Sequence, residues 1–122
     1  MPTAPVRVLE HPAPEEITLE GVLHALSDPT RLRIVRFLWR LEEDEGAPCS
    51  AIELEITKST TTHHFRVLRE AGVISQVYRG TAKMNALRRR DLGALFPGLL
   101  DAILAADAAR HEREDVPARS PA

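Results

Sequence analysis

The most chemically distinctive stretch of the chain is a run of hydroxyl, imidazole and basic side chains between Thr57 and Glu70. If this run is helical, Thr61, Phe65 and Leu68 share one face and point toward a core. The opposite face then carries almost only hydrogen-bond donors and hydroxyl groups, namely Lys58, Ser59, Thr60, Thr62, His63, Arg66 and Arg69. Basic groups pair with phosphates and guanine acceptors, small hydroxyl residues permit close approach, and imidazole can contact a base edge. The sequence therefore predicts a surface that contacts double-stranded DNA.

The distribution of charge supports this prediction, although the formal net charge of the whole chain is only −2. Between Thr57 and Arg90 the sequence holds eight basic side chains and a single acidic one, Glu70. Most of the acidic residues lie in three other segments, 10–20, 42–45 and 101–115. A basic face on an acidic body is expected of a protein that docks on phosphates, and a merely solvated basic surface is the alternative.

Two helices are predicted before the polar run. From Thr18 onward apolar residues recur at helical spacing, which predicts a first amphipathic helix. Asp28 is a good N-cap, and Pro29 suits the first position of a second helix that reaches about Leu41. This second helix is apolar on more than one face, so we expect it in the centre of the core. Its remaining stripe, left for solvent or a partner, consists of Arg33, Arg36 and Arg40.

A β-hairpin is predicted after the polar helix, which we expect to stop at Gly72. Apolar residues alternate over 73–78 and 82–86, on either side of Gly80, a residue suited to the turn. Arg79 is expected at the tip and Lys83 on the returning strand, where both can contact the DNA backbone or minor groove. A short helical turn over 50–54 precedes the polar helix. The predicted fold class is mainly α with a β-hairpin wing, the layout of a winged helix-turn-helix.

The last predicted helix runs from Pro97 to about Ala109. It presents a continuous apolar stripe that a small domain cannot bury alone. We expect this helix to pack with the first one in a homodimer interface formed by Leu19, Leu23, Leu99, Leu100, Ile103 and Leu104.

The chain divides into one domain and two flanks. Residues 1–15 contain four prolines and are expected to form a disordered N-terminal arm. Residues 16–111 should form the winged domain with its dimerisation helices, and 112–122 a disordered tail. No apolar run approaches the roughly 18 residues of a membrane span, and no signal peptide is evident. With a single cysteine, Cys49, the chain is expected in the cytoplasm and without a membrane partner.

Two strings of this sequence resemble a known family. Residues 25–34, ALSDPTRLRI, resemble the opening segment of ArsR/SmtB-type regulators. Residues 58–74, KSTTTHHFRVLREAGVI, are similar to the recognition segment of that family. The resemblance spans roughly Leu19 to Leu104. It implies a dimeric winged-helix transcription regulator, often a repressor, that binds an inverted-repeat operator and is released by an effector, here unidentified.

The family also includes metal sensors, whose patterns this chain follows only in part. Such sensors often carry a Cys-x-Cys at the position of 50–54, where this chain has no cysteine and only Cys49 lies nearby. Soft-metal sites need several sulfurs, so we expect no thiolate site. A second family site uses Asp, His and Glu on the last helix, and Asp107, His111 and Glu114 lie in that region. These residues predict either a metal-responsive regulator or, more simply, a solvated acidic helix end, and no bound metal or cofactor is assigned.

Two other functional classes compete with DNA binding as interpretations of this sequence. The sequence has no Gly-rich phosphate loop and no recognisable nucleophile arrangement, so it is not expected to be an enzyme. A winged-helix protein-interaction module is the other alternative, because fold alone does not define function. Such a module does not need the donor-rich helix face. Of the histidines, His63 is expected in the DNA groove, His64 against the wing or second helix, His24 in packing, and His11 in the arm.

Overall fold

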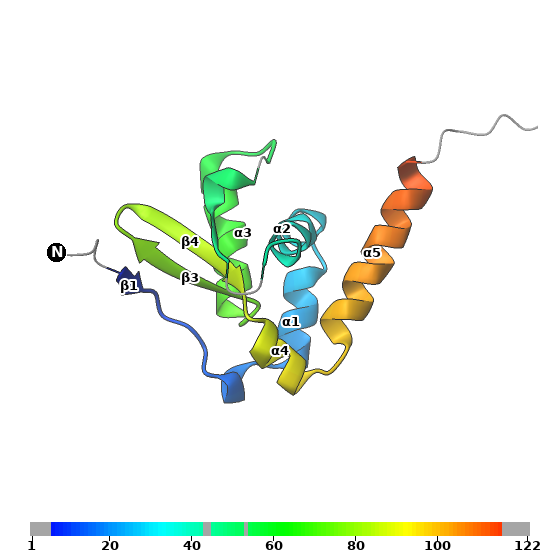
Figure 1. Ribbon diagram of the computed structural model, residues 1–122, viewed down its shortest axis with the longest axis horizontal. Helices are drawn as coiled ribbons and strands as arrows, with labels where there is room; N and C mark the ends of the chain where they lie inside the picture. Colours follow the sequence, from blue (N-terminus) through cyan, green and yellow to red (C-terminus); the bar gives the residue numbers. More distant parts are fainter. Residues whose placement is uncertain (1–5, 43–44, 53, 116–122) are drawn as a thin grey trace, which may run out of the picture.

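The secondary structure is mainly helical with one small antiparallel sheet, as predicted. A computed structural model describes residues 6–42, 45–52 and 54–115 (Figure 1). Its α-helices and 3-10 helices (η) are η1 (Pro14–Glu16), α1 (Leu19–Leu26), α2 (Pro29–Trp39), η2 (Cys49–Ala51), α3 (Lys58–Glu70), α4 (Arg89–Leu95) and α5 (Leu99–Asp115). Its strands are β1 (Val6–Val8), β2 (Ala47–Pro48), β3 (Ile74–Arg79) and β4 (Ala82–Leu87). In Figure 1, α1, α2 and α3 lie between the sheet on one side and α5 on the other.

The three central helices begin where side-chain caps satisfy their first amides. The side chain of Thr18 accepts from the Gly21 amide at 3.0 Å, and Asp28 accepts from the Arg31 amide at the same distance. Each cap satisfies a backbone donor that the helix itself leaves free. The predicted starts of the first two helices are therefore confirmed.

Apolar residues from all three helices, the hairpin and the C-terminal helices meet in one core. Its fully buried members include Val22, Ile34, Val35, Phe65 and Leu68. Phe65 and Leu68 lie on α3 at the spacing predicted for its inner face. The same core therefore fixes which face of α3 looks outward.

The hairpin is part of a four-stranded sheet with the strand order β1-β3-β4-β2. Strands β3 and β4 pair antiparallel from Ile74 opposite Leu87 to Arg79 opposite Ala82, which leaves a two-residue turn. Gly80 occupies this turn with a φ of 65°, a backbone angle that favours glycine. The predicted hairpin is confirmed, with Arg79 at its tip.

The N-terminal segment departs from the expected disordered arm. Val6–Val8 pairs antiparallel with β3, so that Arg7 lies opposite Tyr78. Farther along, His11 Nε2 accepts a hydrogen bond from the Gln76 amide at 2.8 Å. Prolines disfavour helix but are tolerated beside an edge strand, and the free edge of β3 supplies backbone partners that the arm alone lacks. Residues 1–5 lie outside the described residues.

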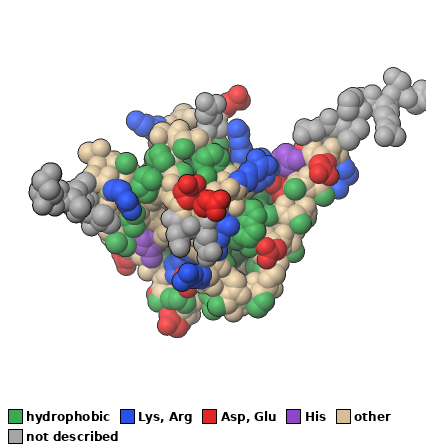
Figure 2. Space-filling model, viewed as in Figure 1, with side chains coloured by type: hydrophobic (Ala, Val, Ile, Leu, Met, Phe, Trp, Pro, Cys, Tyr) green, Lys and Arg blue, Asp and Glu red, His purple; other side chains and the backbone are tan. Residues whose placement is uncertain are grey.

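The C-terminal segment also differs from its predicted boundaries. Helix α4 ends at Leu95, and α5 begins at Leu99 rather than at Pro97. Pro97 lacks an amide donor, and Gly98 has a φ of 78°, so these two residues form the break. Helix α5 continues to Asp115, through the first residues of the expected tail, whereas 116–122 lie outside the described residues. Figure 2 shows Asp and Glu side chains spread along α5.

No single helix of the described segments is long and apolar enough to cross a membrane. Helices α4 and α5 pass the length and composition test only as a pair, and they are bent by 107° at the break between them.

Candidate nucleic-acid interface

The start of α3 is fixed by a cluster of threonine hydroxyls. Thr57 caps the helix by accepting from the Thr60 amide at 3.2 Å. The Thr62 hydroxyl donates to the Lys58 carbonyl at 3.0 Å, and the Thr61 hydroxyl donates to the Thr57 carbonyl at 3.0 Å. These bonds satisfy local backbone groups and leave hydroxyl lone pairs free to accept. The helix therefore presents its first two turns in one defined orientation.

Six of the predicted contact residues lie together on the exposed side of α3. They are Lys58, Ser59, Thr60, Thr62, His63 and Arg66, and all are exposed. Arg66 Nη2 lies 3.4 Å from His63 Nδ1, and its Nε lies 4.0 Å from the Glu70 carboxylate. The opposite face is held in the core by Phe65, which is 1% exposed. The resulting surface combines cationic, imidazole and hydroxyl groups on one rigid helix.

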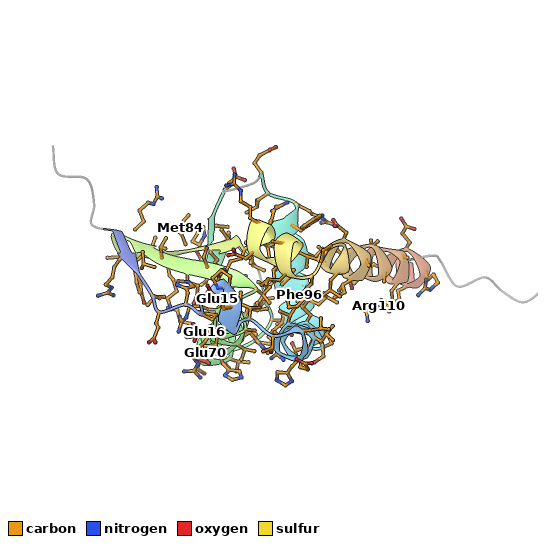
Figure 3. All side chains as sticks on the ribbon, turned by 90° about the horizontal axis from the view of Figure 1, so that it is seen from below. Glu15, Glu16, Glu70, Met84, Phe96 and Arg110 are labelled. Atoms are coloured by element: carbon orange, nitrogen blue, oxygen red, sulfur yellow. The ribbon has the colours of Figure 1, made fainter. Side chains whose placement is uncertain are left out.

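The two ends of α3 differ in charge. At the C-terminal end Glu16 and Glu70 line one groove together with Arg69. Figure 3 shows Glu15 on the same side of the molecule. Carboxylates repel phosphates, so the N-terminal half of α3 is the part suited to an anionic partner.

Arg69 lies inward, unlike the other predicted contact residues of α3. It is half-buried, and its Nη1 donates to Gln76 Oε1 at 2.8 Å. Gln76 in turn donates to Asn85 Oδ1 at 2.6 Å, and Asn85 donates to the Ala47 carbonyl at 3.1 Å. Gln76 and Asn85 are both 0% exposed. Arg69 thus ties α3 to the hairpin, and sequence periodicity missed this polar network because its partners pair across strands.

The hairpin carries basic side chains on the strand ends. Arg79 is exposed next to the turn, and Lys83 is half-buried on the returning strand. The Lys83 amino group lies 5.4 Å from the centre of the Tyr78 ring, and the Arg7 guanidinium lies 4.6 Å from it. A cation over an aromatic face is held electrostatically. Arg7 was missed because its segment was expected to be disordered, although the alternation of Val6-Arg7-Val8 is a strand signal.

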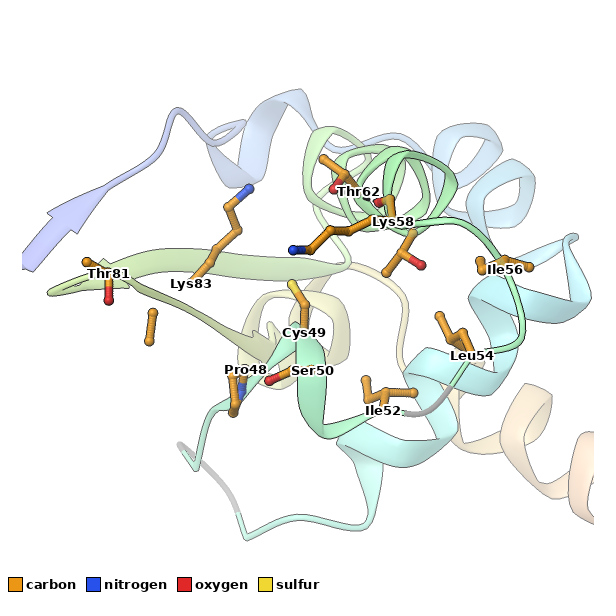
Figure 4. A pocket seen from close by; sticks show the side chains of 12 residues that line it. Pro48, Cys49, Ser50, Ile52, Leu54, Ile56, Lys58, Thr62, Thr81 and Lys83 are labelled. Atoms are coloured by element: carbon orange, nitrogen blue, oxygen red, sulfur yellow. Dashed lines mark hydrogen bonds between the residues drawn. The ribbon is translucent and has the colours of Figure 1, made fainter.

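A groove of about 470 Å³ separates the start of α3 from the hairpin. Figure 4 shows Lys58 on α3 and Lys83 on the hairpin at the sides of this groove, with Cys49 below the Lys58 amino group in this view. Hydroxyls of Thr62 and Thr81 also line the groove. The two ammonium groups and two hydroxyls of this groove can form hydrogen bonds with the phosphates of a DNA backbone.

The neighbouring histidines have different surroundings. His63 is exposed, whereas His64 is half-buried, with its Nδ1 3.2 Å from Arg31 Nη1. Burial lowers the pKa of His64 below its ordinary value of 6.5; Arg31 and His63 lower it further, and Asp28 opposes them. His64 lies against the second helix, one of its two predicted positions. His24 is exposed, so its expected packing role is wrong.

The region predicted as a solvated acidic helix end is instead an ion-pair cluster. The Asp107 side chain is only 1% exposed and accepts from Arg36 at 2.8 Å and from Arg110 at 2.9 Å. His111 Nδ1 lies 3.3 Å from the same carboxylate, while Glu114 is exposed. The guanidinium groups of Arg36 and Arg110 compensate the negative charge of Asp107, as a bound metal ion would. Within the described segments no group of three or more His, Cys, Asp or Glu side chains could hold a metal.

The predicted dimer residues fall into two groups. Leu19 and Leu23 on α1 are 40% and 44% exposed, and Leu99 and Ile103 on α5 are half-buried. Leu100 and Leu104 are buried in the core of the chain itself. The apolar surface available to a partner therefore comes mainly from α1.

Comparisons with known proteins agree on one class. The helix-turn-helix domain family matches residues 26–77. An uncharacterised HTH-type transcriptional regulator of Bacillus subtilis strain 168, YceK, is 30% identical over 82 residues, which cover 67% of this chain and 82% of the relative. The crystal structure of an ArsR family transcriptional regulator superposes with a TM-score of 0.55 and 25% identity, covering 84% of this chain and 97% of the other.

This chain belongs to the helix-turn-helix transcriptional regulators of the ArsR family. The predicted winged helix-turn-helix fold is confirmed, and DNA binding is implied by the class. The family is one of regulators rather than enzymes.

Proposed function

We propose that the chain is a repressor that binds an inverted-repeat operator in double-stranded DNA as a homodimer. The observation that carries this proposal is the outward face of α3, where six polar or basic side chains stand exposed on a helix anchored by Phe65 and Leu68. A helix of this kind fits the major groove, where base edges present distinct donors and acceptors. Such a regulator acts in the cytoplasm, where bacterial DNA lies.

The contacts divide into two kinds in this proposal. Ser59, Thr62, His63 and Arg66 reach base edges, while Lys58, Thr60, Arg79, Lys83 and Arg7 contact phosphates. The groove between Lys58 and Lys83 then receives the sugar-phosphate backbone that separates the two grooves. Arg69 acts indirectly, because its bond to Gln76 fixes the angle between α3 and the hairpin.

Dimerisation follows from the apolar surface of α1 in this proposal. Exposed apolar side chains that lie one helical turn apart, Leu19 and Leu23, favour a partner that removes them from water. Leu99 and Ile103, which are half-buried on α5, extend the same interface. The domain in this proposal reaches from the N-terminal strand β1 to Asp115. A two-fold pair presents two copies of α3 about 34 Å apart, in successive major grooves.

Two alternative functions are less well supported. A metal-responsive site on α5 is disfavoured because Arg36 and Arg110 already neutralise Asp107. A protein-interaction module is disfavoured because it leaves the exposed donors of α3 without a role.

The proposal is tested by titrating labelled duplexes from the DNA upstream of the chain's own gene with the full chain. We expect one fragment to bind at least about a thousandfold more tightly than a scrambled duplex. The logarithm of the binding constant should fall with the logarithm of salt concentration by about 0.9 per phosphate contacted. Equal binding to all duplexes, or binding that salt does not weaken, contradicts the proposal.

A further inference from the structure

A second basic surface lies on α2, away from the face of α3. A groove of about 390 Å³ is lined by Arg33, Arg36, Phe37, Arg40, Ala51 and Ile52. Its volume falls within the range of small-ligand sites. The arginines come from α2 and its C-cap, and the last two residues come from the segment that leads into α3. In Figure 2 a group of Lys and Arg side chains lies beside a histidine on the α5 side of the visible face.

The spacing of the three arginines places their charges together. Positions 33, 36 and 40 are three and four residues apart, so they share one helical face, where like charges repel. Helix α2 contains no acidic residue that could offset them. Arg36 and Arg40 lie near the C-terminus, where the helix dipole favours cations, but Arg33 is the fifth of eleven residues and gains little from it.

The partners of these arginines are unequal. Arg36 Nη1 is held by Asp107 at 2.8 Å and lies 2.9 Å from His111 Nε2. The side chains of Arg33 and Arg40 are exposed, and neither guanidinium forms a hydrogen bond or ion pair with any described residue. One anchored guanidinium therefore stands beside two that are available for a ligand.

We propose that this groove binds a small organic polyanion bearing carboxylate or phosphate groups. Guanidinium forks match both groups with paired hydrogen bonds, and Phe37 with Ile52 provides an apolar wall for a carbon skeleton. The ligand competes with Asp107 for Arg36, and this competition links the groove to α5. The apolar wall of the groove adjoins the segment that leads into α3. The inference that binding alters operator affinity rests on the proposed DNA-binding function, whereas anion binding itself does not.

Calorimetric titration of the full chain without DNA tests the site directly. Citrate and inorganic pyrophosphate are the probes, and their relative affinities show whether the natural ligand carries carboxylates or phosphates. We expect saturable binding of one probe molecule per chain, weakened at least about tenfold in the Arg33→Gln/Arg40→Gln double variant. Arg113→Gln, which removes an exposed charge from α5, should bind like wild type. Circular dichroism of both variants checks that the fold is kept.

Three results overturn the proposal. The first is the absence of saturable binding by either probe, and the second is an equal loss in Arg113→Gln. The third is a double variant that binds the probes as wild type does. If that variant loses only DNA affinity and salt dependence, the arginines contact DNA phosphates instead of a small ligand. In a second arm the bound probe should shift operator affinity of wild type at least about threefold and leave the double variant unchanged. If the chain binds the probe but no duplex, the anion site is supported and the proposed DNA-binding function is contradicted.

Discussion

At the residue scale, the base recognition that we propose depends on His63 and Arg66. Both are exposed, and Arg66 Nη2 lies within 3.4 Å of His63 Nδ1, so the two side chains form one contact group. Replacing either by Ala should weaken operator binding by about 1–3 kcal/mol and leave scrambled DNA less affected. Fluorescence anisotropy with both duplexes measures the difference, and Glu112→Ala on α5 is the control. Wild-type affinity in both variants removes α3 from the recognition role.

The basic side chains of the hairpin should behave differently. Arg79 stands at the turn, and Arg7 on the neighbouring strand β1 lies over Tyr78. In the proposed function both contact phosphates rather than base edges. Arg79→Ala and Arg7→Ala should lower the affinity for operator and scrambled duplex by the same factor. Each should also reduce the salt slope by about 0.9. A changed base preference at constant overall affinity reverses this assignment.

Residue types and helical periodicity were sufficient to predict the outward face of α3. They placed Lys58, Thr62, His63 and Arg66 on the exposed side because Phe65 and Leu68 define the buried one. The same reasoning placed Arg69 outward, and this was wrong. Its partner Gln76 is buried only because β3 and β4 pair with Gln76 opposite Asn85, a register that arises from tertiary packing.

At the scale of elements, the junction between α3 and β3 depends on Gly72. Its φ is 83°, and a Cβ there would lie 2.5 Å from Ile17 Cγ1 in the core. Gly72→Ala should therefore lower the free energy of unfolding by about 2 kcal/mol or more, from backbone strain and overpacking. In α4 a Cβ at Gly93 meets nothing within 4 Å, so Gly93→Ala should be neutral or stabilising by about 0.5–1 kcal/mol. Urea denaturation compares the two, and equal midpoints contradict the packing of this junction.

The docking of the N-terminal segment should depend on pH through His11. Burial lowers the pKa of His11 below its ordinary value of 6.5, with Arg88 and Arg69 acting in the same direction. The unfolded chain then binds more protons than the folded one near and below pH 6.5, so stability is lost as pH falls through that region. Protonation also prevents His11 from accepting the Gln76 amide.

Hydrogen exchange of the Gln76 amide, corrected for its intrinsic rate, follows this docking. We expect lower protection at pH 5.5 than at pH 7.5, and low protection at both values in His11→Ala. His64, whose pKa is shifted the same way, contributes to global stability, so His64→Gln serves as the control. Protection that is equal at both pH values in wild type excludes the proposed link.

The order of elements was largely predictable, whereas the flanks were not. Caps at Asp28 and Thr57 and the turn at Gly80 mark helix starts and the hairpin locally. Strand β1 pairs with the edge of β3, far away in the sequence, whereas the prolines of residues 1–15 suggested disorder instead. Local patterns contain no information on which distant edge is open.

At the scale of the whole molecule, α1 should control dimerisation. Leu23→Glu puts a charge on a side chain that is 44% exposed, so the chain should still fold while its partner is repelled. Sedimentation equilibrium at micromolar concentration should find a dimer for wild type and a monomer for this variant. Val8→Glu, at a 66% exposed position on β1, should remain dimeric. A wild-type chain that is monomeric contradicts the proposed dimer. A Leu23→Glu variant that remains dimeric places the interface elsewhere.

Hydroxyl-radical footprinting of the chain on its operator duplex tests the central claim, that two α3 helices of a homodimer contact successive major grooves. Two blocks of protection are expected, with their centres about one helical turn, 10–10.5 base pairs, apart. Both blocks should weaken together in Arg66→Ala at the lowest concentration that saturates wild type, because each contains one copy of the same helix. A single protected block, or two blocks that persist unchanged in Arg66→Ala, contradicts the claim.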